Sequence, residues 1–429
     1  MLGNDTSNIY LLLYISAWII TFVVYWKKKK YFGAGLLIVS SYIFYAVISF
    51  SLYNNPYAVS TFKALTFFPF VYLFVMLLIS LQPVLKYNEK SIIQQPSISL
   101  VNFISWSIVI VTLITLPSVL SHIQDGVTLI LTTERGGIDL YNEFRMGNHT
   151  SNSFLNIFYA LGNISSDISV LFLFYYLTLP NKNKNLLLGL LLGAITSILS
   201  SLADGLRTEA SMKILLIFGS YFLFKEQLSK SVRRTMKTIG IVLLSFVFVV
   251  MAALTISRFA SAEGGANFQV ERYIGQANLY FNNYCFDAGG IRYGDRTCNV
   301  FKKLLLFDNV PNDVMATRAK YSNMKIDDGS FYTFVGDFVL DFGPIYGALI
   351  LIIFSILFCL LTKPKKRGKI LFHQLILVYF VMSVCIQGGM YLFYYSFKMN
   401  YVIIAYFLFY LLFRWDYHTI RAKRLEVKC

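Results

Sequence analysis

Charged residues are scarce in this sequence. They make up only 14% of the 429 residues, against about 25% in an average soluble domain, whereas 56% of the residues are hydrophobic. A charge costs several kcal/mol in hydrocarbon, so this deficit is typical of a chain that faces lipid. Apolar runs of the roughly 20 residues that a helix needs to cross a bilayer recur along the whole chain. The composition therefore excludes an ordinary soluble protein and predicts a polytopic membrane protein.

Signals of several other protein classes are absent as well. The sequence contains no Walker A loop and no Rossmann glycine fingerprint, so ATP-driven transport within this chain is not expected. The cysteines and histidines show no metal-ligand spacing, and we expect neither a metal nor another cofactor. Cys285 and Cys298 share one polar segment and could form a disulfide in an oxidising compartment, which the sequence leaves open.

Acidic residues are fewer than basic ones, and the formal net charge is +16. Nucleic-acid binding is one explanation of such a charge, and positive-inside membrane topology is the other. The basic runs lie in short breaks between apolar runs or in the carboxyl-terminal tail: 27–30, 182–184, 225–237, 363–369 and 421–428. This placement indicates topology, and no nucleic-acid partner is expected.

If these basic runs are cytoplasmic, about eleven transmembrane helices alternate sides without conflict. The amino terminus then lies outside, the carboxyl terminus lies in the cytoplasm, and residues 1–429 form a single polytopic, all-α membrane domain. The predicted spans are 8–26, 31–52, 63–84, 100–119, 152–178, 186–203, 209–224, 238–257, 333–361, 370–396 and 400–415. Gly388 and Gly389 could break the tenth of these helices.

Two predicted exterior segments, 120–150 and 258–332, are too long to be simple turns. The first combines the apolar stretch from Val127 to Leu131 with later charged residues and could be an amphipathic helix on the membrane surface. The second mixes charges with many aromatic residues. Aromatic residues suit both carbohydrate contact and the membrane interface, so their role stays open.

Arginines are unexpectedly frequent on the predicted outer side. Arginine presents a fork of donors that matches phosphate oxygens, so an outward cluster suggests an anionic ligand such as a lipid-linked phosphate or pyrophosphate. Local salt bridges with acidic residues of the same segments are the alternative. The arginines concerned are Arg135, Arg145, Arg207, Arg258, Arg272, Arg292, Arg296 and Arg318.

Arg207 is the most informative of these arginines. It lies beside Asp204 in a tight turn between two predicted helices, and such a turn needs no charge to form. The turn also supplies the amino end of the next helix, whose free N–H groups and dipole attract an anion. Lys213, further along this helix, is either a functional intramembrane cation or a lysine that snorkels to the surface.

Carboxylates and one histidine provide candidate acid–base groups. Asp337 and Asp341 are four residues apart and share a helix face, where they could act as a base or pair with arginines. His149 follows Arg145 by four residues and titrates near neutral pH, although a lone loop histidine is often incidental. Asp167, within a predicted span, is explained equally well by internal hydrogen bonding and by function.

Three features together resemble the O-antigen polymerase (Wzy-type) family, the repeat-unit polymerases of bacterial surface polysaccharides. They are the turn Gly205-Leu206-Arg207 before a helix, the long arginine- and aromatic-rich segment before the third-last helix, and the stretch from Asp341-Phe342-Gly343 to Gly347. The resemblance covers nearly the whole chain by topology, although its motifs are short. The glycines at 336, 343 and 347 also permit close helix packing, which alone would explain them.

The resemblance implies a GT-C-like glycosyltransferase of the bacterial cytoplasmic (inner) membrane, with its active site facing the periplasm or exterior. Its donor would be a growing O-antigen or capsule glycan on undecaprenyl pyrophosphate, and its acceptor a lipid-linked repeat unit. No metal would be needed. Expected partners are membrane lipids, a chain-length regulator and the flippase of the same pathway.

The resemblance also implies roles for particular residues. The pyrophosphate would be held by cationic groups, and an acid–base group would accept the proton of the acceptor hydroxyl. The candidates for pyrophosphate are Arg207, Arg145, Arg258, Arg272, Arg135 and Lys213, and those for the hydroxyl are Asp204, His149 and Asp341.

Some alternatives are weighed against this interpretation. O-antigen ligases carry a histidine near the start of the helix that follows their large loop, where this chain has Tyr332 and Thr333. A flippase or transporter of an anionic lipid-linked oligosaccharide would place its arginines around a cavity between two halves, and no internal repeat is seen. A membrane acyltransferase would require an embedded histidine with a polar partner, and His373 lies at a predicted helix start without an obvious one.

Overall fold

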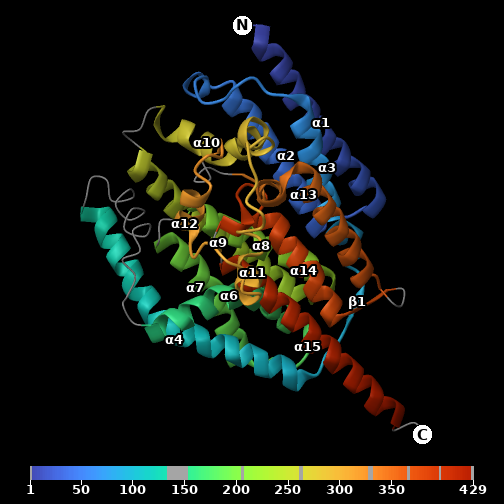
Figure 1. Cartoon of the computed structure of the whole chain (residues 1–429). Coiled ribbons are helices and arrows are strands. Elements are labelled where there is room, and N and C mark those ends of the chain that lie inside the picture. The colour runs from blue at the N-terminus through green and yellow to red at the C-terminus, as the bar shows by residue number, and fades with distance from the viewer. Residues whose placement is uncertain are drawn as a thin grey trace. The chain divides into compact units, whose positions relative to one another are not determined.

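The computed structural model describes residues 2–132, 153–203, 207–259, 264–326, 332–364, 368–395 and 398–426, and its architecture is helical (Figure 1). A helix coincides with each predicted span, which confirms the helical class. These helices are α1 (Leu2–Lys29), α2 (Ala34–Tyr53), α3 (Phe67–Lys86), α4 (Ile98–Thr132), α6 (Ser153–Thr178), α7 (Lys184–Ala203), α8 (Arg207–Phe224), α9 (Lys230–Phe259), α13 (Phe334–Leu361), α14 (Phe372–Gln387) and α15 (Lys398–Glu426). One short parallel pairing, between β1 (Ile92–Gln94) and β2 (Lys369–Leu371), is the exception to the helical class among the described residues.

Several helices are long and apolar enough to cross a membrane. Within the described residues these are six: α1, α2, α3, α4, α7 and α13. They are consistent with a polytopic membrane protein. The count of eleven spans, the GT-C-like fold and the sidedness of the termini stay predictions.

The chain forms two compact units. Unit 1 contains residues 1–87, 267–363 and 380–404, and unit 2 contains residues 88–266, 364–379 and 405–429. The single membrane domain over 1–429 and the exterior placement of 120–150 and 258–332 stay predictions.

Unit 1 is built on α1, α2, α3 and α13, and the polar segment before α13 packs on them. In this segment α10 (Gly265–Tyr280) crosses α2 at Gly275, where an added Cβ atom would lie 2.8 Å from the carbonyl oxygen of Ile48. Ser49 of α2 donates to the Gly275 carbonyl at 2.7 Å, and Asn278 donates to the Ser49 hydroxyl at 3.0 Å. A glycine at the crossing therefore lets the two backbones meet, and polar side chains join them.

Unit 2 is built on α4, α6, α7 and α8, and small residues again set the closest approach. Cβ atoms added to Gly189 and Gly193 of α7 would lie 2.6 Å from a Val109 methyl carbon and 3.0 Å from the Thr112 hydroxyl of α4. Small residues at such positions allow helices to pack closely where lipid provides no hydrophobic driving force between them.

Two of the helix ends that differ from the predicted boundaries have a cause that the sequence shows. The fourth predicted span ended at residue 119, but α4 continues to Thr132, because the apolar stretch Val127 to Leu131 prolongs the helix. The tenth predicted span, 370–396, is shorter in the structure, because α14 ends at Gln387, directly before Gly388 and Gly389. Gly388 accepts a 2.7 Å hydrogen bond from the backbone N–H of Phe334, and an added Cβ atom there would meet the Phe334 side chain.

The helix α13 is broken at Gly343 and Pro344. Gly343 has φ 78° and ψ 168°, a conformation that is essentially restricted to glycine. Sixteen residues separate Phe338 from Phe354, which would place them about 24 Å apart along a straight helix. Their ring centroids are 6.4 Å apart, and an added Cβ atom on Gly347 would lie 2.9 Å from the Phe338 carbonyl oxygen. The first segment of α13 (334–342) therefore folds back onto the second (344–361).

We predict that Gly343→Ala lowers the free energy of unfolding by about 1–3 kcal/mol, because alanine is strained at this backbone conformation. Thermal unfolding in detergent measures the effect. The control is Gly240→Ala in α9, where the added Cβ atom would lie in ordinary contact with Phe218 at 3.8 Å and alanine favours the helix. Equal midpoints for the two variants would contradict the break at Gly343.

Candidate functional site

The first segment of α13 carries two buried carboxylates. Asp337 and Asp341 lie on consecutive turns, as their spacing predicted, and both side chains are buried. The backbone is close to its neighbours here, since a Cβ atom added to Gly336 would lie 3.0 Å from the sulfur of Cys285. Cys285 and Cys298 are both free thiols in the structure, so they do not form the disulfide that the sequence left open.

A loop formed by residues 290–298 covers the broken end of this segment. Pro344 has no N–H group, so it cannot bond the carbonyl of Leu340 as a continuous helix would require. The loop supplies the missing donors: the N–H of Arg292 bonds the Leu340 carbonyl at 2.9 Å, and the N–H of Gly294 bonds the Asp341 carbonyl at 3.3 Å. The break in α13 and the loop are therefore complementary.

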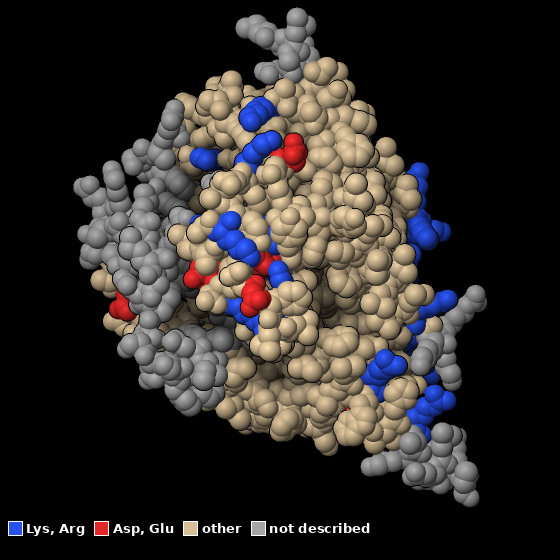
Figure 2. Space-filling view, in the orientation of Figure 1, with Lys and Arg blue, Asp and Glu red and all other residues tan. Residues whose placement is uncertain are grey.

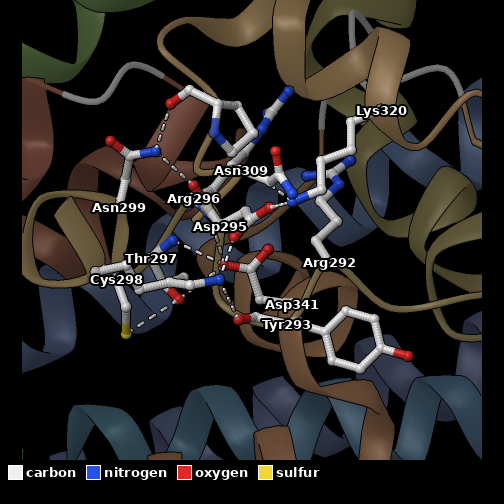
Figure 3. Close-up of polar contacts among 12 residues, drawn as sticks. Arg292, Tyr293, Asp295, Arg296, Thr297, Cys298, Asn299, Asn309, Lys320 and Asp341 are labelled. Atoms are coloured by element: carbon white, nitrogen blue, oxygen red, sulfur yellow. Dashed lines mark hydrogen bonds and ion pairs between the residues drawn. The ribbon is translucent and has the colours of Figure 1, made fainter. Parts of the chain in front are cut away.

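The side chain of Asp341 fixes the same loop (Figure 3). Its Oδ2 atom accepts hydrogen bonds from the Thr297 N–H at 2.7 Å, the Thr297 hydroxyl at 2.8 Å and the Arg296 N–H at 3.2 Å. A carboxylate that accepts backbone N–H bonds is strongly stabilised in a buried site. Asp341 therefore orders residues 296 and 297 on α13.

Asp337 and two buried arginines complete the cluster. The Oδ2 atom of Asp337 accepts a hydrogen bond from the Tyr394 N–H at 3.1 Å. Arg292 and Arg296 are buried, and their positive charges act on Asp337, while Arg292 also acts on Asp341. Since a buried charge requires a compensating charge, these aspartates and arginines stabilise one another.

Asp295 links the loop to the two short helices α11 (Asn299–Leu304) and α12 (Val314–Lys320). Its buried carboxylate pairs with Lys320 of α12 at 2.7 Å (Figure 3). It also pairs with Lys302 of α11 and accepts a hydrogen bond from the Tyr321 hydroxyl at 2.7 Å. Burial raises the pKa of Asp295, but the hydrogen bonds from Lys302, Lys320 and Tyr321 outweigh burial and hold the pKa below its usual value. Burial and the bond to Asp295 raise the pKa of Tyr321.

A cavity of about 290 Å³ lies beside Asp295 in this segment. Arg292 and Arg318 line it together with polar and apolar groups of Thr317, Tyr321, Ser322, Met324 and Ile326. Guanidinium and hydroxyl groups around one space are able to bind an anion. Figure 2 shows that uncharged side chains cover most of the face in view, whereas basic and acidic groups gather at its centre, over α11 and α12.

Unit 2 contains an ion pair between α6 and α8. Lys213 of α8 contacts Asp167 of α6 at 2.8 Å and donates to the Ser166 hydroxyl at 2.8 Å. The hydroxyl of Tyr379 donates to the Asp167 carbonyl at 2.7 Å. Lys213 therefore points to a buried partner instead of snorkelling to the surface. Asp167 is held by internal hydrogen bonds, which was one of the two explanations that the sequence offered for it.

The chain matches one known protein family. A family model described as O-antigen polysaccharide polymerase Wzy matches residues 1–272, which is more than half of the chain. The chain belongs to this family. Searches of curated proteins and of solved structures found no match. The resemblance noted in the sequence is confirmed, and it makes the chain a multi-pass membrane protein of polysaccharide biosynthesis.

The range matched by the Wzy family model contains one of the two charged clusters described above. The pair of Lys213 and Asp167 lies inside the matched range, whereas the cluster around Asp341 lies beyond it. Wzy proteins act on lipid-linked oligosaccharide repeat units, so both regions belong to a protein that handles an amphiphilic substrate.

The predicted Wzy site residues fall into three groups. Asp204, His149, Arg145 and Arg135 lie outside the described residues. Arg207 begins α8 and Arg258 lies near the end of α9, where only the backbone is described. The described side chains are Arg272, half-buried on α10, together with Lys213 and Asp341. The structure places Arg272 and Asp341 in unit 1 and Lys213 in unit 2, and the assigned roles stay predictions.

Sequence reasoning missed the importance of Thr297 and the lysine partners of Asp295. The sequence predicted arginine partners for the acidic residues of this segment, but the ion pairs of Asp295 in the structure are with Lys302 and Lys320. The lysines follow Asp295 by 7 and 25 residues, a separation that carries no recognisable signal. The pairing depends on the fold of the loop.

We predict that acid weakens the attachment of α11 and α12. The folded-state pKa of Asp295 lies below its unfolded value of about 3.9, so its stabilisation is complete above about pH 4 and is lost as the pH falls through the folded pKa. Hydrogen exchange of residues 299–320 measures the effect. Asp295→Asn should remove this acid-sensitive step, whereas the exposed-site control Asp308→Asn should retain it; an acid step that persists in Asp295→Asn would contradict the assignment.

We predict that the ion pair of unit 2 is strongly coupled. Lys213→Met or Asp167→Asn alone leaves an uncompensated buried charge and should destabilise the protein by about 3–5 kcal/mol. The double variant removes both charges and should regain most of this loss. Thermal unfolding of the three variants in detergent measures the coupling. Additive losses in the double variant would show that the two side chains do not depend on each other.

Proposed function

We propose that this Wzy-family protein is a repeat-unit polymerase of O-antigen or capsule. It transfers a growing glycan from undecaprenyl pyrophosphate to a lipid-linked repeat unit on the outer face of the bacterial cytoplasmic membrane. The family match over residues 1–272 carries the proposal. The apolar helices support a membrane-embedded enzyme that meets lipid-linked substrates where they reside.

The reaction is a substitution at the anomeric carbon of the donor. A hydroxyl oxygen of the acceptor forms the new bond to this carbon, and the bond from the carbon to the pyrophosphate oxygen breaks. The hydroxyl proton passes to a base, and undecaprenyl pyrophosphate leaves with the electron pair. Stabilisation of the negative charge that develops on the leaving group lowers the barrier, so cationic side chains are required near it.

Arg207 is the first choice for the group that holds the pyrophosphate. It stands at the first residue of α8, where free backbone N–H groups and the helix dipole also attract an anion. Arg145, Arg135, Arg258 and Arg272 are the further candidates. Arg292 and Arg318 in the wall of the cavity of unit 1 support an anionic ligand in the same polar segment.

Two of the earlier candidates receive different roles. The charge of Lys213 is balanced by Asp167, so we assign it to the stability of unit 2 before any phosphate contact. The Oδ2 atom of Asp341 accepts three hydrogen bonds and its side chain is buried, so we assign Asp341 to positioning the loop. His149 and Asp204 are then the preferred bases for the acceptor hydroxyl.

A flippase for an anionic lipid-linked oligosaccharide is the second candidate function. Ionisable residues within membrane helices often mark transport pathways, and the pair of Lys213 and Asp167 is such a feature. The fixed contacts of this pair with Ser166 favour a structural role instead.

Deletion of the gene distinguishes the two functions. The lipopolysaccharide or capsule of the deletion strain is separated by gel electrophoresis. A polymerase predicts that the ladder of chain lengths collapses to a single repeat unit on the lipid core. Loss of every exported repeat unit would point to the flippase instead.

We predict that Arg207→Ala, expressed in the deletion strain, fails to restore the ladder while its protein level stays normal, because the leaving pyrophosphate loses its main cation. The control is Arg234→Ala, an exposed arginine of α9 on the predicted cytoplasmic side, which should restore the ladder. The gel and an immunoblot are the measurements. Normal chain lengths with Arg207→Ala would refute the assignment of Arg207 but not the polymerase function.

A further inference from the structure

Four consecutive apolar side chains project from the polar segment of unit 1. They are Leu304, Leu305, Leu306 and Phe307, at the end of α11, and we call them the apolar tip. Each is more than half exposed, and Leu306 is 87% exposed. Single exposed apolar residues are common on protein surfaces, but a contiguous exposed patch marks contact with another molecule or with a membrane.

The backbone conformation at Leu306, in the apolar tip, is also unfavourable for a leucine. Leu306 has φ 57°, in the left-handed region. It follows the last turn of α11. There the backbone N–H of Leu306 donates to the Lys303 carbonyl at 3.1 Å, and the backbone N–H of Phe307 donates to the Lys302 carbonyl at 3.0 Å. Glycine is the usual residue at such a helix end. Neither the left-handed backbone conformation nor exposure to water favours a leucine here. The exposed side chain of Leu306 therefore points to contact with another molecule.

Hydrogen bonds connect the apolar tip to the break in α13. Lys302, in α11, donates to the Tyr293 carbonyl at 3.2 Å and pairs with Asp295. The neighbouring N–H groups of residues 292 and 294 bond the carbonyls of Leu340 and Asp341. The apolar tip is therefore attached to α13 at the break formed by Gly343 and Pro344.

An exposed apolar strip on α13 begins at this break. Its side chains are Ile345, Tyr346, Leu349, Ile353, Phe354, Ile356, Leu357 and Leu360. Residues 344–361 extend about 27 Å, close to the roughly 30 Å hydrocarbon thickness of a bilayer. A strip of this length and composition suits contact with lipid, and the break would then lie at a membrane–water boundary.

We propose that the apolar tip inserts into the lipid at this boundary and anchors the loop of residues 290–298 to the bilayer. The partner is the membrane itself, because the apolar tip is attached where the lipid-facing strip of α13 begins. The anchor would hold Arg292 and Asp295 at a fixed depth beside the membrane. This inference does not depend on the glycan that the protein handles.

A depth measurement tests the insertion. The full chain, with Cys298, Cys359 and Cys429 replaced by serine, receives Leu306→Cys, is labelled with an environment-sensitive fluorophore and is placed in phosphatidylcholine nanodiscs. Asp287→Cys, at an exposed polar site of the same segment, is the matched control. Nitroxide groups on the lipid acyl chains should quench most of the fluorescence at 306 and little at 287. Equal, weak quenching at both positions overturns the proposal.

A second variant separates insertion from folding. Leu306→Gly removes the side chain and places glycine at a left-handed position, so the melting temperature in detergent should stay unchanged or rise. A marked fall in the melting temperature would mean that Leu306 packs inside the protein, which overturns the proposal. Shielding of the label at 306 that appears only with a partner protein, and without quenching by the lipids, would assign the apolar tip to a protein interface and also overturns it.

Discussion

The carboxylate of Asp341 and the broken end of α13 hold the polar segment of unit 1 in place. Gly343 and Pro344 interrupt the helix and leave carbonyl groups without helical donors, and the loop at 292–297 satisfies these carbonyls through its own N–H groups. The Oδ2 atom of Asp341 then binds residues 296 and 297 from the other side. Because buried backbone groups must be paired, neither the break nor the loop is stable without the other. The positions of Arg292, Asp295 and the apolar tip all follow from this contact.

Paired charges recur in both units, and they limit which residues are available for a ligand. Asp295 joins Lys302 and Lys320 in unit 1, and Asp167 joins Lys213 in unit 2. Such pairs are costly to break, because one uncompensated charge would remain in a region of low polarity. Positive charge near lipid is thus partly structural in this Wzy-family protein. The role of Arg207, the first residue of α8, in binding a pyrophosphate stays a prediction.

Hydrophobic runs and basic breaks were enough to predict the helices, because helix length and charge follow from the chemistry of the bilayer. The break at Gly388 was also recognisable, whereas Gly343 was expected only to permit close helix packing and instead interrupts α13. The fold-back of α13 was not predictable, because a Gly-Pro pair does not reveal which segments meet after the turn. The role of Thr297 was hidden as well, since its bond to Asp341 spans 44 residues. Contacts between distant residues depend on how the loop folds, and local composition does not encode them.

A proximity measurement within α13 tests the central claim, namely that the first segment folds back and presents Asp341 to the loop. Phe338→Cys and Phe354→Cys are combined in the full chain, and the membrane-embedded protein is treated with a short bifunctional thiol reagent. The ring centroids of these residues are 6.4 Å apart, so the account predicts an efficient intramolecular crosslink between the two positions, found by mass spectrometry of the digested protein. A continuous helix would separate the two positions by about 24 Å. Absence of this crosslink, with both thiols shown to be reactive, would contradict the account.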